Sequence, residues 1–116
     1  MKRILLVDDD PDITASLYHL LREKYDVGIA SNGFAAIDKL RESDYDLILL
    51  DLLMPGLDGP GLVDALHERG TTTPILLISA SRSAAEKARI LQATDYLLKP
   101  FNIEELEEKI ERLIGK

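Results

Sequence analysis

Short apolar runs alternate with amphipathic stretches along the whole chain. Four of these runs end directly in a polar or charged residue: residues 4–7 in Asp8, 47–50 in Asp51, 75–78 in Ser79 and 96–98 in Lys99. A strand that is buried on both faces of a parallel sheet has such an unbroken apolar sequence. The alternation therefore predicts an α/β domain in which helices cover both faces of a parallel sheet.

The alternation divides the chain into five expected strands and five expected helices. We expect the strands at residues 4–7, 25–30, 47–51, 75–79 and 96–98. Local signals mark the helix ends: Asp10 precedes Pro11 as a cap, Gly33 opens the second helix, Gly70 ends the third, and residues 83–86 and 102–105 read as capping boxes. Neither repeats nor linkers interrupt this order, so we expect a single domain over residues 1–116.

The composition limits the classes of function. A length of 116 residues with 46% hydrophobic content suits one domain with a real core. The formal charge of −7, from 14 basic and 21 acidic residues, argues against direct binding to nucleic acid or to an anionic membrane, so we expect proteins or cations as partners. The absence of cysteine excludes disulfides and suits a reducing cytoplasm. The first apolar run is too short for a signal peptide, and none approaches the length of a membrane span.

Carboxylates follow two of the apolar runs. The carboxyl ends of parallel strands share one edge of the sheet, where ligands collect, so we expect Asp8, Asp9 and Asp51 to meet there. Two like charges about 4 Å apart repel by roughly 4 kcal/mol at an effective dielectric constant near 20. A divalent cation would offset this repulsion, and Mg²⁺ prefers one or two carboxylates with water and phosphate oxygens. The three aspartates therefore predict a Mg²⁺ site.

The same edge suits phosphoryl transfer. A carboxylate beside a metal ion can attack phosphorus and form an acyl phosphate. Lys99 would pair with the phosphoryl oxygens and Ser79 would donate a hydrogen bond to another of them. Each residue also has a structural interpretation, since aspartates cap helices and start turns, and a lysine or serine at a strand end is often simply solvated. Their coincidence at one edge favours a functional site.

Four ordered segments resemble the receiver domain of two-component response regulators. The segments are residues 4–10, 47–59, 77–80 and 95–101, and together they extend the resemblance over essentially the whole chain. The resemblance implies the flavodoxin-like (CheY-like), doubly wound sheet of five parallel strands in the order 2-1-3-4-5. It also implies that Asp51 is the phosphoacceptor and that Lys99 binds the phosphoryl group. The Mg²⁺ ligands would be Asp8, Asp9, Asp51 and the backbone carbonyl of Leu53, with Mn²⁺ able to substitute.

The resemblance further implies a signalling switch rather than a dedicated enzyme. A sensor histidine kinase or phosphotransfer protein would supply the phosphoryl group, and metal-assisted autodephosphorylation would remove it. Ser79 and Tyr96 would form a switch pair that alters the face of the fourth helix, last strand and fifth helix, which contacts an effector domain or target protein. The chain would be a monomer or a phosphorylation-dependent homodimer. The Lys99–Pro100 bond is expected to be cis, as X-Pro bonds alone allow cheaply.

Two other functions fit parts of the sequence. A receiver-fold module can bind partners without phosphorylation, although such modules typically lack one of the acids, the hydroxyl or the lysine. A phosphohydrolase can use an aspartyl nucleophile, but the commonest such motif has a second aspartate two positions on, where this chain has Leu53.

The chain departs from the family pattern before the last strand. The segment from Ser79 to Lys99 is slightly short, and Gln92 and Thr94 replace a commoner approach that contains glycine. Without glycine, the usual left-handed helix ending is unfavourable. We therefore expect the fourth helix to be short or irregular.

Overall fold

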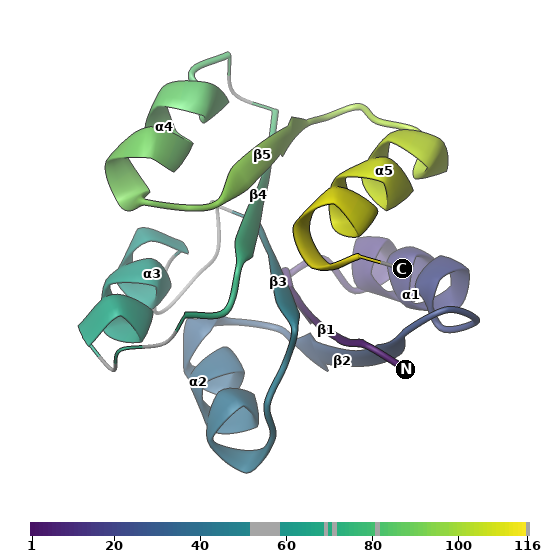
Figure 1. Cartoon of the computed structure of the whole chain (residues 1–116), viewed down its shortest axis with the longest axis horizontal. Helices are drawn as coiled ribbons and strands as arrows, with labels where there is room; N and C mark the ends of the chain where they lie inside the picture. The colour runs from purple at the N-terminus through teal and green to yellow at the C-terminus, as the bar shows by residue number, and fades with distance from the viewer. Residues whose placement is uncertain (52–58, 69, 71, 81, 116) are drawn as a thin grey trace.

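The computed structural model describes residues 1–51, 59–68, 70, 72–80 and 82–115 (Figure 1). The described residues form five strands and five helices in strict alternation. The strands are β1 (Arg3–Val7), β2 (Asp26–Ala30), β3 (Leu47–Asp51), β4 (Ile75–Ser79) and β5 (Asp95–Leu98). The helices are α1 (Pro11–Leu21), α2 (Gly33–Glu42), α3 (Gly59–Glu68), α4 (Ala84–Leu91) and α5 (Ile103–Ile114). None of these helices is long and apolar enough to cross a membrane.

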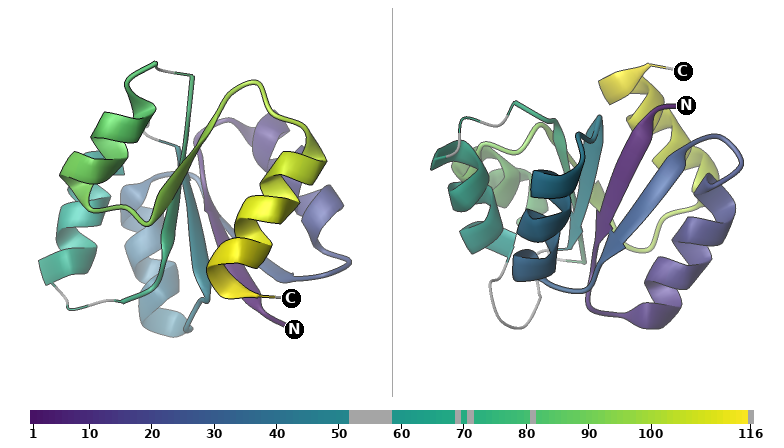
Figure 2. Two further views of the ribbon diagram at one scale, coloured as in Figure 1. Left: turned by 45° about the horizontal axis from the view of Figure 1, so that its top comes forward. Right: turned by 90° about the horizontal axis from the view of Figure 1, so that it is seen from below.

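All strands pair in parallel in one sheet of order β2-β1-β3-β4-β5. Helices α1 and α5 cover one face of this sheet, and α2, α3 and α4 cover the other (Figures 1 and 2). The predicted fold class and strand order are confirmed. The arrangement places β3 at the centre, with β1 and β4 beside it.

Each central strand contributes to a hydrophobic core on both faces of the sheet. In β1, Leu5 and Val7 join the core beneath α2, α3 and α4, whereas Ile4 and Leu6 join the core beneath α1 and α5. Successive side chains of a strand point to opposite faces, so a strand covered on both sides needs apolar residues at every position. This double burial explains the unbroken apolar runs.

Side-chain caps fix the starts of α1 and α5 as predicted. The Asp10 carboxylate accepts hydrogen bonds from the backbone amides of Asp12 and Ile13, at 2.9 and 3.4 Å, with Pro11 in the first helical position. In α5, Asn102 and Glu105 form the complete reciprocal capping box. Capping satisfies amides that have no partner within the helix, and so sets where each helix begins.

The capping box expected at Ser83 is wrong. Ser83 precedes α4, but its side chain makes no capping hydrogen bond to the described residues of that helix. Its backbone lies at φ −95° and ψ 18°, whereas a capping residue normally has an extended backbone that directs its oxygen at the first turn. The residue types at positions 83–86 match the capping-box motif, but the backbone conformation of Ser83 does not.

Helix α4 is short, as expected, with eight residues. It ends at Gln92, which has the left-handed conformation (φ 61°) although the sequence offers no glycine there. The next amide, that of Ala93, donates to the carbonyl of Ala88 at 2.9 Å, which is the bond that closes a Schellman motif. The usual ending is therefore present, with a glutamine in place of glycine. Helix α3 is followed by the expected left-handed glycine, Gly70 (φ 72°).

Candidate functional site

Side chains from four strand ends gather at the carboxyl edge of the sheet. Asp51 is the last residue of β3 and Ser79 the last of β4, while Asp8 follows β1 and Lys99 follows β5. The backbone amide of Lys99 donates to the carbonyl of Ser79 at 2.9 Å. The described part of the chain thus brings the predicted acids, hydroxyl and lysine to one edge, with Asp9 directly after Asp8.

Lys99 and Asp51 form a partly buried ion pair. The lysine Nζ lies 2.9 Å from Oδ2 of Asp51, and the two side chains are 29% and 13% exposed. The Coulomb attraction within an ion pair shielded from water is stronger than within a surface pair, because the effective dielectric constant is lower. The Lys99–Pro100 bond is cis, as predicted. The ion pair directs the lysine at the carboxylate that the resemblance implies to be the phosphoacceptor.

The Asp8 carboxyl is electrostatically coupled to this pair. Burial raises the pKa of Asp8 above its ordinary value, and the charges of Asp51 and Asp9 act in the same direction. The hydrogen bond from the Asp10 amide, at 3.0 Å to Oδ1, and the charge of Lys99 oppose these effects. The edge therefore holds more negative than positive charge, which a bound cation would offset.

The carboxylates of Asp8, Asp9 and Asp51 form a donor set that suits Mg²⁺. Among the described residues, no group of three Asp, Glu, His or Cys side chains is placed to hold a metal ion. One oxygen of Asp51 pairs with Lys99, and one oxygen of Asp8 accepts from the Asp10 amide. Leu53, whose carbonyl was the fourth expected ligand, lies outside the described residues. Hard carboxylate oxygens remain the ligands that Mg²⁺ prefers.

The expected switch residues lie on the same face of the sheet. Tyr96 pairs in register with Leu77, and Ser79 is two residues beyond Leu77, so both side chains point toward the α2, α3 and α4 layer. Ser79 is only 8% exposed, while Tyr96 is partly exposed and packs against the core on that face. Diagonal neighbours on adjacent strands are within reach of a long aromatic side chain.

Sequence reasoning missed one pair of residues near Tyr96. The Nζ atom of Lys109, on α5, lies 3.0 and 3.2 Å from the two carboxylate oxygens of Asp95, the first residue of β5. The same nitrogen lies 5.6 Å from the centre of the Tyr96 ring. Nothing in the local sequence signals this contact, because it depends on how α5 packs beside β5.

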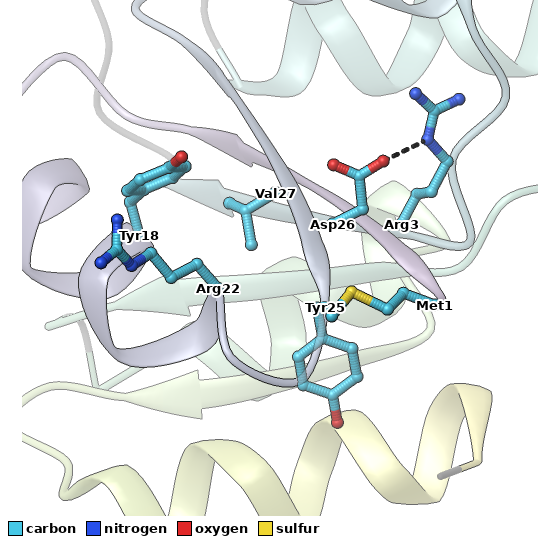
Figure 3. A pocket seen from close by; sticks show the side chains of 7 residues that line it. All are labelled: Met1, Arg3, Tyr18, Arg22, Tyr25, Asp26 and Val27. Carbon is cyan, nitrogen blue, oxygen red and sulfur yellow. Dashed lines mark hydrogen bonds and ion pairs between the residues drawn. The ribbon is translucent and has the colours of Figure 1, made fainter.

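A separate open pocket lies at the opposite, amino-terminal end of the sheet (Figure 3). It has a volume of about 340 Å³ and is lined by Met1, Arg3, Tyr18, Arg22, Tyr25, Asp26 and Val27. Arg3 is already paired with Asp26 at 3.0 Å within it. The pocket contains none of the residues predicted to carry function, so the acidic carboxyl edge is the stronger candidate site.

Comparisons with known proteins agree with the fold. The family described as "Response regulator receiver domain" matches residues 4–111 of the chain. The chain belongs to this family, whose members are signalling domains rather than dedicated enzymes. The resemblance drawn from the four sequence segments is therefore confirmed.

Individual relatives and solved structures cover 97–100% of the chain. It is 39% identical to the transcriptional regulatory protein CiaR of Streptococcus pneumoniae over 100% of this chain and 53% of CiaR. It is 36% identical to TrrA of Thermotoga maritima, solved with Mg²⁺ and fluoroberyllate, with a TM-score of 0.86 over 97% of this chain and 99% of TrrA. The receiver domain of the sensor histidine kinase PA1611 from Pseudomonas aeruginosa, solved with magnesium in its active-site cleft, is 31% identical, with a TM-score of 0.85 over 99% of this chain and 98% of that domain. The chain spans about half the length of the curated relatives it matches.

Proposed function

We propose that this domain is a phosphorylation-dependent switch that accepts a phosphoryl group on Asp51 in a Mg²⁺-dependent reaction. The observation that carries the proposal is the position of Asp51 at the end of the central strand, 2.9 Å from the ammonium of Lys99 and coupled to the charge of Asp8. The donor is a sensor histidine kinase or a phosphotransfer protein in the cytoplasm.

In the transfer, a carboxylate oxygen of Asp51 forms a bond to phosphorus. The phosphorus–nitrogen bond of the donor phosphohistidine breaks, and its electron pair leaves with the imidazole. Lys99 turns from the carboxylate to the phosphoryl oxygens, and the buried hydroxyl of Ser79 donates a hydrogen bond to one of them. When bound through Asp8, Asp9, Asp51 and the carbonyl of Leu53, Mg²⁺ or Mn²⁺ supplies positive charge that offsets the carboxylates and phosphoryl oxygens.

A partner recognises the phosphorylated state at the face formed by α4, β5 and α5. Ser79 moves toward the new oxygens, and the Tyr96 ring moves toward the space beside it, which favours one of two conformations. Ile90 of α4 and Leu98 of β5 are exposed apolar residues of these elements that could contribute contacts to a partner. The partner is an effector domain, a target protein or a second phosphorylated copy of the chain. Hydrolysis of the acyl phosphate returns the domain to its resting state.

The test is the intact mass of the protein after incubation with Mg²⁺ and acetyl phosphate. We expect the wild type to gain one labile phosphoryl group and Asp51→Asn to gain none. Asp44→Asn is the matched control, because it removes the charge of an exposed aspartate outside the site and should be labelled like the wild type.

Two results would count against the proposal. Equal labelling of the wild type and Asp51→Asn would show that another residue is the acceptor. A wild type that gains no mass with either the small donor or a histidine kinase would instead favour an interaction module that works without phosphorylation.

A further inference from the structure

Lys109 contacts two consecutive residues of β5 that face different sides of the sheet. Asp95 pairs in register with Leu76, whose side chain lies in the core under α1 and α5, and Tyr96 pairs with Leu77, which lies in the opposite core. Strand β5 is at the edge of the sheet, so no further strand of the described residues covers its outer side. The ammonium of Lys109 reaches both residues there, at 3.0 Å from Asp95 and 5.6 Å from the Tyr96 ring centre.

The two contacts have different strengths and roles. The Lys109 and Asp95 side chains are 25% and 21% exposed, and both carboxylate oxygens accept from the ammonium, so the ion pair fixes the position of the charge. The cation is within the distance at which the face of an aromatic ring attracts it. Asp95 therefore anchors the ammonium, and the ammonium favours the present position of the Tyr96 ring.

This contact lies on the opposite side of Tyr96 from Ser79. Asp95 is the first residue of β5, so the anchored ammonium is at the amino-terminal end of that strand. Ser79 pairs in register with Leu98, two residues beyond Tyr96 toward the carboxyl end. A ring that moves toward Ser79 consequently moves away from Lys109 and loses the attraction of the cation.

We propose that Lys109 is a positioning residue that holds Tyr96 in the resting conformation and so opposes the switch. This inference rests on the proposed phosphorylation of Asp51. A ligand that favours the switched conformation must overcome every interaction present only in the resting one. Removing the contact between Lys109 and Tyr96 therefore raises the affinity for a phosphoryl mimic, even though Lys109 is remote from Asp51 in sequence and touches neither Asp51 nor Lys99 among the described contacts.

The test measures the affinity of the folded protein for fluoroberyllate in the presence of Mg²⁺. Lys109→Met keeps the apolar length of the side chain and removes the charge. We expect its affinity to rise about two- to fivefold, the range that corresponds to an exposed cation–π contact. Lys109→Arg keeps a positive charge that can pair with Asp95 and attract the ring, so it should bind like the wild type.

Lys24→Met is the matched control for charge and for loss of an ion pair with α5. Lys24 pairs with Glu107 of α5 at 2.9 Å but has no ring contact with Tyr96 among the described residues. We expect its fluoroberyllate affinity to equal that of the wild type.

Tyr96→Leu provides the second control, because the effect of Lys109→Met should disappear in that background. A Lys109→Met affinity that is unchanged, or that rises equally in the Tyr96→Leu background, would overturn the role of Lys109.

A second measurement separates this inference from the proposed function. Fluorotyrosine incorporation gives one fluorine NMR signal for each of the four tyrosines, and Tyr96→Phe assigns the signal of Tyr96. Without any phosphoryl mimic, Lys109→Met should shift that signal and Lys24→Met should not. An unmoved Tyr96 signal would overturn the contact itself. Failure of the wild type to bind fluoroberyllate, with the signal still shifted, would instead overturn the phosphorylation of Asp51 and the opposing role that depends on it.

Discussion

The Nζ atom of Lys99 lies 2.9 Å from Oδ2 of Asp51, although β4 lies between β3, which ends in Asp51, and β5, which Lys99 follows. The ion pair spans β4 at the carboxyl edge and is largely shielded from solvent on the aspartate side, which is 13% exposed. In the resting protein, the charge of the proposed phosphoacceptor is thus balanced by the lysine that we propose binds the phosphoryl group.

This pair predicts that Lys99→Met destabilises the metal-free protein. The substitution leaves the Asp51 carboxylate partly buried beside the charge of Asp8, so we expect a loss of about 1–2 kcal/mol, reduced from the fully buried case because Lys99 is partly exposed. Urea unfolding in EDTA measures this loss in the free energy of unfolding. In the Asp51→Asn background the loss should largely disappear, and an equal loss in both backgrounds would show that the lysine stabilises the fold through its packing instead.

Millimolar Mg²⁺ should raise the melting temperature of the wild type. An ion that binds only the native state stabilises it by mass action, by about 1.4 kcal/mol when its concentration is ten times Kd. Asp9→Ala should abolish this increase. Asp12→Ala, which removes an exposed acid of α1 near the site, should retain it. A wild type with the same melting temperature with and without Mg²⁺ would mean that the acidic edge is structural.

The raised pKa of Asp8 predicts a pH-dependent effect of Asp8→Asn. Burial raises the pKa of Asp8 in the folded protein above the ordinary value of 3.8, so the ionised carboxyl destabilises the fold at pH 7. That unfavourable contribution is relieved as the pH falls through the folded pKa, and it is absent below the unfolded pKa. In EDTA, Asp8→Asn should therefore be more stable than the wild type at pH 7, and the difference should shrink toward pH 4.

Urea unfolding at both pH values measures this difference. With saturating Mg²⁺ the order should reverse, because the wild type alone keeps a charged ligand for the ion. A metal-free Asp8→Asn variant that is less stable than the wild type at pH 7 would contradict the electrostatic account of the site.

The left-handed backbone of Gln92 predicts that Gln92→Gly stabilises the protein. A side chain at φ 61° is unfavourable, and after allowance for the greater freedom of glycine in the unfolded chain we expect a gain of about 0.5–1 kcal/mol. Ala85→Gly is the control, since it places the same residue at an exposed helical position of α4 and should destabilise by about 0.5–1 kcal/mol. Thermal unfolding distinguishes the two signs, and a destabilised Gln92→Gly would show that its side chain makes contacts that outweigh the strain.

Amide exchange should locate the conformational change produced by phosphorylation. Helix α4 is short, and its first residues receive no capping hydrogen bond from Ser83 among the described contacts, so we expect it to carry the larger share of the altered protection when fluoroberyllate and Mg²⁺ are added. The altered amides should lie in α4, β5 and α5. Changes confined to the neighbourhood of Asp8 and Asp51 would show that the switch does not act through Ser79 and Tyr96.

Most of the fold follows from the sequence because its causes are local. Double burial requires unbroken apolar strands, and caps such as Asp10 and Asn102 act within one turn of helix. The placement of Asp51 and Lys99 at one edge also follows, because all parallel strands deliver their carboxyl ends to the same side of a sheet.

The remaining features depend on tertiary packing. Residues 83–86 have the residue types of a capping box, but Ser83 lacks the backbone conformation that a cap needs. Gln92 adopts a conformation that its residue type disfavours, because the route from α4 to β5 imposes it. The pairing of Lys109 with Asp95 joins two elements whose mutual position no local pattern encodes. The arrangement of Asp8 and Asp51 depends on competing hydrogen bonds to Asp10 and Lys99, which composition alone does not reveal.

Because side chains alternate along β5, the number of residues in that strand determines which layer each side chain enters. Asp95 belongs to the layer of α5, and Tyr96 belongs to the layer of α4. Inserting one residue between Leu77 and Ser79, or between Tyr96 and Lys99, would reverse which layer each later side chain enters, while leaving every functional residue type in place. The proposed switch therefore depends on parity as well as on chemistry: an insertion of one residue between Leu77 and Ser79 would keep every motif residue but turn Ser79 away from the layer that Tyr96 faces.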